Sequence, residues 1–146
     1  MARRAKVDEI DAKIIETLLR DSRTPFSRIA RDLGLSDVAV LKRVRKLERL
    51  GVIEGYTVRV DPRKLGYEVV SITGIDVEPE RLVGVLEELK SIDCVKYLAM
   101  TSGDHAIIAI IWARDFEELS SITKKISELP GVKRVCPAVV TGIYKA

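Results

Sequence analysis

The 146-residue sequence predicts an α+β fold with an N-terminal three-helix domain (1–52), a linking strand and hinge (53–66) and a C-terminal βαββαβ domain (67–146). Apolar residues first recur with the period of a helix and, beyond Gly51, alternate as in strands. The charges divide in the same way. Residues 1–66 hold 16 Lys and Arg against 10 Asp and Glu, whereas residues 67–146 hold 9 against 12. The overall charge of +3 therefore combines a basic N-terminal part with an acidic C-terminal part.

Residues 24–36 carry the signals of a short helix followed by a tight turn. Thr24 is the expected N-cap and Pro25 the first helical residue, where its missing N–H costs little. The apolar residues that share one face of this helix are Phe26, Ile29, Ala30 and Leu33. Gly34 then permits the bend, and Leu35 is expected to fill the space beneath it. The pattern predicts the first half of a helix-turn-helix.

A second, longer helix is predicted from Asp37 to Leu50, with Ser36 as its N-cap and Gly51 ending it. Its apolar stripe consists of Val40, Leu41, Val44 and Leu47. On a helical wheel the residues facing away from this stripe are Val38, Ala39, Lys42, Arg45, Lys46 and Arg49. The outward surface thus has a small apolar tip followed by a basic shaft.

This distribution suits a recognition helix, because residues near its N-terminus reach base edges and later cations neutralise phosphates. An ordinary solvated basic face is the alternative, but the cap, the Gly turn and the near absence of acids on that face favour double-stranded DNA as the partner. The predicted DNA-binding residues are Arg23, Thr24, Ser36, Asp37, Val38, Ala39, Lys42, Arg43, Arg45, Lys46 and Arg49.

A third helix completes this domain. Asp8 is its expected cap, and Ile10, Ile14 and Leu18 recur at intervals of four. The basic residues 1–6 before it are either a frayed tail or an arm on DNA, and they contain too few apolar residues for a signal peptide or membrane anchor.

The sequence contains no Asn and no Gln, and 32% of its residues are charged, which suggests a thermophile. Since Asn and Gln are the usual partners of adenine, base reading must rely on Arg, Lys, hydroxyl groups and apolar contacts to thymine. We therefore expect DNA shape to contribute much of the specificity.

The two cysteines, Cys94 and Cys136, are too few for a disulfide framework or a zinc site, and no metal or cofactor is expected. No apolar run is long enough to span a membrane, so we expect a cytoplasmic protein.

After Gly51, the residues Tyr56, Val58 and Val60 alternate with polar residues and predict a strand that stops at Pro62. This strand is either a wing on DNA or a tether that pairs with a second copy. Pairing is the more economical reading, because a lone strand leaves its edges unpaired.

The C-terminal part reads as strand, helix, strand, strand, helix and strand, the split βαβ or ferredoxin-like arrangement. The predicted strands begin near Glu68, Cys94, Ala106 and Val132, and the last extends to Ile143. Cys94 and Cys136 fall on the two outer strands. Helices cover one face only, so the opposite face, with residues such as Val70, Ile72, Ile108 and Ile110 or their alternates, needs another cover. A homodimer is the simplest cover.

The polar residues 101–105 lie between two apolar strands and include the only histidine, His105. From the residues alone, a β-hairpin turn is the favoured reading, and a lone His is a poor metal ligand. No catalytic constellation is present, so we expect no enzyme.

Together these residues resemble the Lrp/AsnC family of prokaryotic transcription regulators, in its archaeal type, along nearly the whole chain. The resemblance is carried by DEIDAKIIETL at 8–18, IARDLGLS at 29–36, RVRKLERLGVIEGYT at 43–57, the P-x-x-L-G-Y pattern at 62–67, SGD at 102–104 and LPGV at 129–132.

The resemblance implies a DNA-binding regulator of amino-acid-linked genes that forms dimers, often assembled into octamers, and binds an amino acid. It implies an effector site at Ser102, Gly103, Asp104 and His105, with Thr141 on the last strand. Backbone N–H groups near the Gly would hold a carboxylate, and Asp104 an ammonium. The sequence departs from the family's G-D-x-D pattern at Ala106, which leaves a ligand-independent architectural DNA-binding protein as the alternative.

Overall fold

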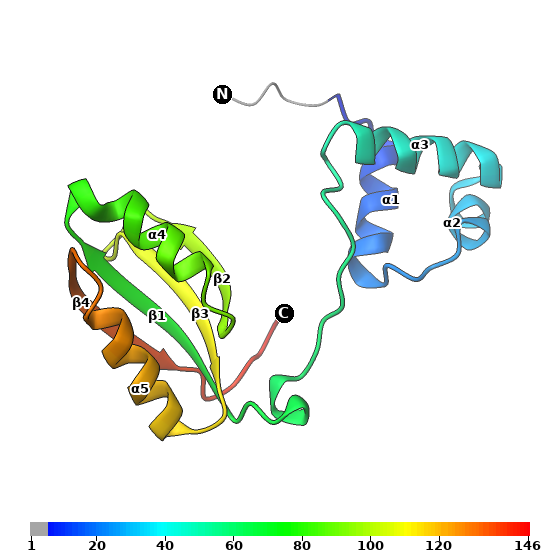
Figure 1. Cartoon of the computed structure of the whole chain (residues 1–146). Helices are drawn as coiled ribbons and strands as arrows, with labels where there is room; N and C mark the ends of the chain where they lie inside the picture. Colours follow the sequence, from blue (N-terminus) through cyan, green and yellow to red (C-terminus); the bar gives the residue numbers. More distant parts are fainter. Residues whose placement is uncertain (1–5) are drawn as a thin grey trace. The chain divides into compact units, whose positions relative to one another are not determined.

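The computed structural model describes residues 6–146 and divides the chain into two compact units, the first ending at Arg59 and the second formed by Val60–Ala146. The first unit contains helices α1 (Glu9–Arg20), α2 (Phe26–Leu33) and α3 (Asp37–Arg49) (Figure 1). This confirms the predicted three-helix domain. Of the basic segment at 1–6, only Lys6 lies within the described residues.

The helix ends follow from local sequence. Asp8 and Asp11 form a capping box at the start of α1, and Ser36 accepts a hydrogen bond from the Ala39 N–H at the start of α3 (3.1 Å). Gly34 ends α2 with φ of +67°, a conformation that favours glycine. The prediction of Thr24 as N-cap is wrong, because Pro25 occupies that position without a side-chain cap. The Thr24 hydroxyl instead donates to the Asp21 carbonyl (2.7 Å).

The apolar faces of the three helices meet in one small core. Its buried residues are Ile14, Leu18, Ile29, Ala30, Val40 and Val44, with Ile10, Phe26, Leu33, Leu35 and Ile53 packed around them. Leu35 therefore fills the space next to the Gly34 bend, as the sequence predicts.

The linking segment differs from its prediction. Residues 54–61 are not assigned to a strand, and Tyr56, Val58 and Val60 are exposed. Strand assignment requires a second strand alongside, and within residues 6–146 none pairs with this segment. A short 3₁₀ helix, η1 (Pro62–Leu65), follows.

The second unit has the predicted βαββαβ order, with the four-stranded antiparallel sheet arranged β2-β3-β1-β4. Its elements are β1 (Val69–Val77), the 3₁₀ helix η2 (Pro79–Arg81), α4 (Leu82–Lys90), β2 (Val95–Met100), β3 (Ile107–Ala113), α5 (Phe116–Ser127) and β4 (Val132–Val139). The last strand is shorter than predicted, since it ends at Val139. The free cysteines lie at opposite edges, Cys94 just before β2 and Cys136 on β4.

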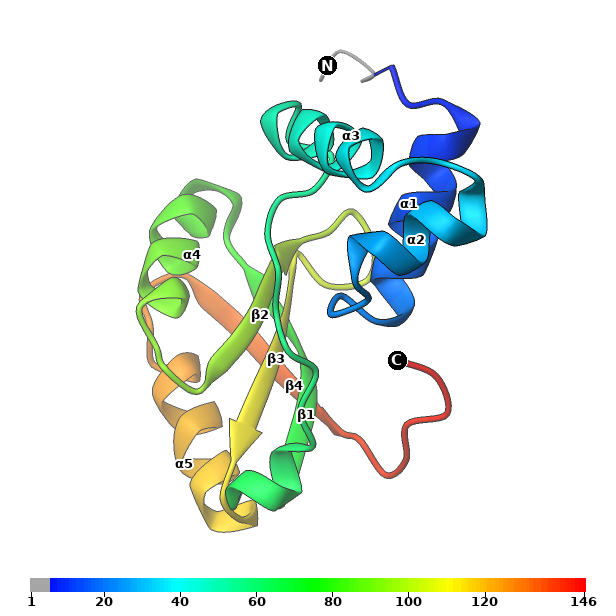
Figure 2. The ribbon, with the colours of Figure 1, turned by 90° about the vertical axis from the view of Figure 1, so that its right-hand side faces the viewer.

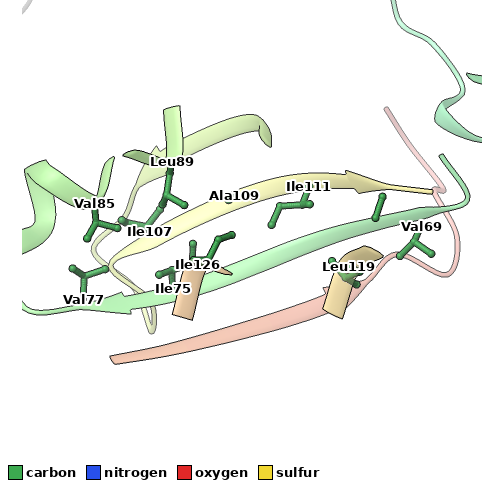
Figure 3. Packing of buried hydrophobic residues seen from close by; sticks show 11 residues of the cluster. Val69, Ile75, Val77, Val85, Leu89, Ile107, Ala109, Ile111, Leu119 and Ile126 are labelled. Atoms are coloured by element: carbon green, nitrogen blue, oxygen red, sulfur yellow. The ribbon is translucent and has the colours of Figure 1, made fainter. Parts of the chain in front are cut away.

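Helices α4 and α5 pack on the same face of the sheet (Figures 1 and 2). Alternate residues of β1 and β3 point into this core, where Ile75 and Ile107 lie near Leu89 of α4 and Ile126 of α5, and Ile111 lies farther along β3 (Figure 3). All five are at most 1% exposed. The helix-facing side therefore accounts for the apolar core of this unit.

The opposite face of the sheet is covered by no helix of this unit. Val70, Ile72, Ile108 and Ile110 lie on it, as predicted, and Ile72 is 46% exposed. Tyr97, which pairs with Ile110, is 55% exposed. We refer to this surface as the open face. Among the described residues, no helix is both long and apolar enough to cross a membrane.

Candidate DNA-binding helix and effector loop

Helix α3 presents two distinct rows of cations. Lys42, Arg45 and Arg49 recur at spacings of three and four, and all three are exposed. Val38, near the N-terminus of the helix, is 58% exposed, and Ala39 beside it is half-buried. This surface has the apolar tip and basic shaft expected of a helix that enters the major groove.

The remaining predicted DNA-binding residues surround the helix starts. Ser36 and Asp37 are exposed at the beginning of α3, although the Ser36 hydroxyl is engaged in capping. Arg23 is exposed in the turn before α2, where its N–H donates to an Asp21 carboxylate oxygen (2.9 Å). Contacts of all these residues with DNA stay predictions.

The second row, Arg43 and Lys46, points toward α1. The Arg43 Nη1 lies 2.9 Å from Asp11 Oδ1 and 2.7 Å from Asp8 Oδ2, and the Lys46 Nζ lies 2.6 Å from Asp11 Oδ2. The side chain of Asp11 is 0% exposed. We call these four residues the Asp11 network. Burial raises the pKa of Asp11, but the hydrogen bonds from Lys46 and Arg43 outweigh it and leave this pKa lowered.

The network corrects the helical-wheel expectation for Lys46, whose ammonium is bound to a buried carboxylate instead of facing freely outward. The sequence does contain a signal for the Asp11 network. Asp11 precedes Ile14 and Leu18 at helical spacing, so it lies on the apolar stripe of α1, where a carboxylate requires a partner.

The predicted effector loop lies between β2 and β3, at the end of the sheet where β1 ends and β4 begins (Figure 2). Ser102, Gly103 and Asp104 are exposed. Thr101 closes the loop, since its N–H donates to the Ala106 carbonyl (2.9 Å) and its hydroxyl to the His105 carbonyl. Thr141 is exposed and follows β4 instead of lying on it.

His105 leaves the loop and folds onto the open face. A Cβ atom added to Gly74 of β1 would lie 2.1 Å from the His105 Cδ2, so only glycine leaves room for the imidazole. The His105 Nδ1 lies 2.9 Å from Asp76 Oδ1, and the Arg134 Nε of β4 donates to Asp76 Oδ2 (2.8 Å). The pKa of Asp76 is lowered, most of all by the hydrogen bond with His105 and next by the hydrogen bond from Arg134.

Of the predicted effector residues, the structure thus keeps Ser102, Gly103 and Asp104 at the surface and gives His105 an intramolecular partner. Sequence reasoning missed Gly74, Asp76 and Arg134, because their meeting depends on long-range strand register. Ala106 packs against the apolar core between the sheet and helices α4 and α5. Within residues 6–146, no group of three or more His, Cys, Asp or Glu is placed to hold a metal ion.

The fit between Gly74 and His105 can be tested with Gly74→Ala. The added methyl group must displace the imidazole, so we expect a loss of roughly 1–3 kcal/mol in the free energy of unfolding and a changed NMR signal of the single imidazole. Gly84→Ala on α4, where a Cβ meets no atom within 4 Å, is the control. An unchanged imidazole signal in Gly74→Ala would contradict the contact.

The Asp11 network makes a pH-dependent contribution to stability. Because the pKa of Asp11 is lowered on folding, its contribution is complete above the unfolded value of about 3.9 and disappears as the pH falls through the folded value. Asp11→Asn is expected to lower the free energy of unfolding by about 3–5 kcal/mol at pH 7. The difference should shrink progressively as the pH falls from the unfolded pKa toward the lowered folded pKa, as measured by urea unfolding. Glu16→Gln, at an exposed position of α1, should show a small difference at both pH values. If the difference in unfolding free energy between the wild type and Asp11→Asn stayed constant with pH, this role of Asp11 would be excluded.

Comparisons with known proteins agree with both units. Residues 7–48 match the AsnC-type helix-turn-helix domain, and residues 70–146 match the Lrp/AsnC ligand binding domain. The HTH-type transcriptional regulator LrpA of Pyrococcus horikoshii is 53% identical over 135 residues, which cover 92% of this chain and 96% of LrpA. Pyrococcus is a thermophilic genus, in agreement with the missing Asn and Gln.

Solved structures give the same assignment. AsnC of E. coli superposes with a TM-score of 0.86 at 26% identity and covers 97% of both chains. LrpC of B. subtilis superposes with a TM-score of 0.85 at 28% identity and covers 97% of this chain and 99% of its own. The chain therefore belongs to the Lrp/AsnC family and is a transcriptional regulator, not an enzyme, with a helix-turn-helix DNA-binding domain and a ligand-binding domain.

Proposed function

We propose that α3 is the recognition helix, that the open face joins two copies of the chain, and that the effector loop binds an amino acid which modulates assembly and DNA binding. The observation that carries the first part is the row of exposed cations, Lys42, Arg45 and Arg49, behind the small residues Val38 and Ala39. No ion-pair partner is found for these three cations among residues 6–146. They are therefore available to phosphates while the tip of the helix meets base edges.

A second copy is the proposed cover of the open face. Ile72 on the central strand β1 and Tyr97 on the edge strand β2 leave apolar surface exposed on a sheet whose other side is packed against α4 and α5. A two-fold dimer presents the same patch from both chains, which suits a face built of alternating strand residues. It also supplies two recognition helices for paired DNA half-sites. Two-fold pairing is likewise the proposed use of the exposed segment at 54–61, and further assembly of dimers into octamers is part of the proposal.

The amino-acid site is proposed at the exposed part of the loop, Ser102 to Asp104. The Asp104 carboxylate would pair with the ligand's ammonium, and backbone N–H groups at Ser102 and Gly103 would hold its carboxylate. His105 would have only a secondary role in binding the ligand, because its Nδ1 is already hydrogen-bonded to Asp76. Thr141 is kept as a candidate on the chain after β4. The ligand acts by preferring one assembly over another.

A ligand-independent architectural role is the alternative. It is favoured by two observations, the absence of Asn and Gln for reading adenine and the apolar position of Ala106 in place of a second carboxylate. The two functions differ in their response to amino acids and in how strongly one duplex is preferred over another.

The role of α3 predicts a salt effect. Lys42→Met and Arg45→Met should each weaken binding to any duplex and reduce the slope of log K against log salt by about 0.9, because each removes one phosphate contact. Lys124→Met, at an exposed position of α5, is the matched control and should leave the slope unchanged. Equal slopes for all three variants would rule out α3 as the DNA-facing helix.

The dimer is tested by placing a charge on the open face. Ile110→Asp should shift the chain toward monomer in sedimentation equilibrium, since a buried unpaired carboxylate opposes association. Val83→Asp alters an exposed apolar residue of α4 (73% exposed) and should leave the dimer intact. Dissociation by the control alone would place the interface on the helices.

The effector is tested by calorimetry of the protein with a panel of the twenty amino acids. At least one should bind, and Asp104→Asn should weaken that binding at least tenfold without changing the oligomeric state in the absence of ligand. Asp93→Asn, in the exposed turn before β2, is the control. If no amino acid binds, the architectural alternative is the better account.

A further inference from the structure

The Asp11 network divides the five cations of α3 into an exposed group and a group bound to carboxylates of α1 and its N-cap. Lys42, Arg45 and Arg49 are exposed, whereas Arg43 and Lys46, one turn apart, are both engaged with α1. The engaged side chains are only 27% and 33% exposed. The helix therefore has five cations in its sequence but only three on its proposed DNA-facing surface.

The two engaged cations are held by a carboxylate with no access to water. Each oxygen of Asp11 has its own cation, Oδ1 with Arg43 and Oδ2 with Lys46. Moving either cation to a phosphate would leave an oxygen of this buried carboxylate without its cation, although Oδ2 would keep the Asp8 N–H (3.3 Å). An exposed phosphate contact does not offset that cost. DNA therefore has little power to recruit them.

Asp8 reinforces the arrangement from the edge of the network. One of its oxygens accepts the Asp11 N–H (2.8 Å), and the other accepts from Arg43 (2.7 Å). The same two carboxylates thus cap α1 and fix it against α3. The position of the recognition helix and the number of its free cations depend on one group of side chains.

We infer that Asp11 is a specificity-determining positioning residue: it withholds Arg43 and Lys46 from DNA and so limits sequence-independent binding relative to base reading. The inference rests on the proposed role of α3 as recognition helix. Non-specific affinity grows with the number of phosphates neutralised, while base contacts near Val38 and Ala39 are unaffected by extra cations. Pairing Arg43 and Lys46 with Asp11 therefore weakens sequence-independent DNA binding more than it weakens base-specific binding.

The test measures binding to an unrelated duplex, and to DNA from upstream of the chain's own gene, over a range of salt concentrations. Asp11→Asn keeps the shape of the side chain but removes its charge. The slope of log K against log salt should become steeper by up to about 0.9 for each released cation, with tighter binding to the unrelated duplex and a smaller preference for the upstream DNA. Circular dichroism and thermal unfolding verify that the variant is folded at the temperature used.

Three further variants separate the inference from simpler explanations. Asp8→Asn, whose side chain is 52% exposed, removes only an outer contact and should act in the same direction with a smaller effect. Arg43→Met and Lys46→Met should leave the slope at its wild-type value. Glu16→Gln removes an exposed acid of α1 and controls for net charge.

The outcomes distinguish this inference from the proposed function. If Lys42→Met flattens the slope but Asp11→Asn and Asp8→Asn leave it unchanged or shallower, α3 binds DNA and the withholding role is refuted. A purely structural role predicts weaker binding to both duplexes with no steeper slope. If Lys42→Met itself has no effect, the proposed recognition helix fails first.

Discussion

The ion pairs of buried Asp11 with Arg43 and Lys46 are the constraint on which the DNA-binding unit depends. Three short helices enclose a small apolar core, and such a core alone leaves the crossing of its helices weakly defined. A carboxylate without water must keep both partners, so it fixes where α3 lies against α1. That requirement divides the cations of α3. The set of cations that α3 leaves exposed thus follows from an interaction on the neighbouring flank of the helix.

The second unit is governed by a different constraint, a sheet with helices on one side only. The packed side forms the core, and the open face leaves Ile72 and Tyr97 to solvent in a single chain. His105 connects this face to the effector loop, because its imidazole rests on Gly74 and contacts Asp76. The proposed ligand site and the proposed dimer surface are thus joined by one side chain. A ligand that alters the loop has a physical route to the assembly.

Local patterns predicted most of the fold. The helix starts at Asp8 and Ser36, the turn at Gly34 and the βαββαβ order depend on neighbouring residues or on periodicity, and the structure confirms them. Sequence patterns did not predict contacts between side chains that lie far apart in the chain. The Lys46 ammonium turns to an acid 35 positions earlier in the chain, and His105 meets Asp76 across the strand register. The strand predicted at Tyr56, Val58 and Val60 is not formed, because no second strand pairs with it within residues 6–146.

We propose that this regulator recognises DNA with the paired α3 helices of a two-fold assembly. Hydroxyl-radical footprinting of the full chain on DNA upstream of its own gene, at physiological salt, tests it most directly. We expect discrete protection in patches separated by about one helical turn, roughly 10–10.5 base pairs, as two recognition helices enter successive major grooves. Uniform protection along the whole fragment, or protection confined to one unrepeated patch, would contradict it.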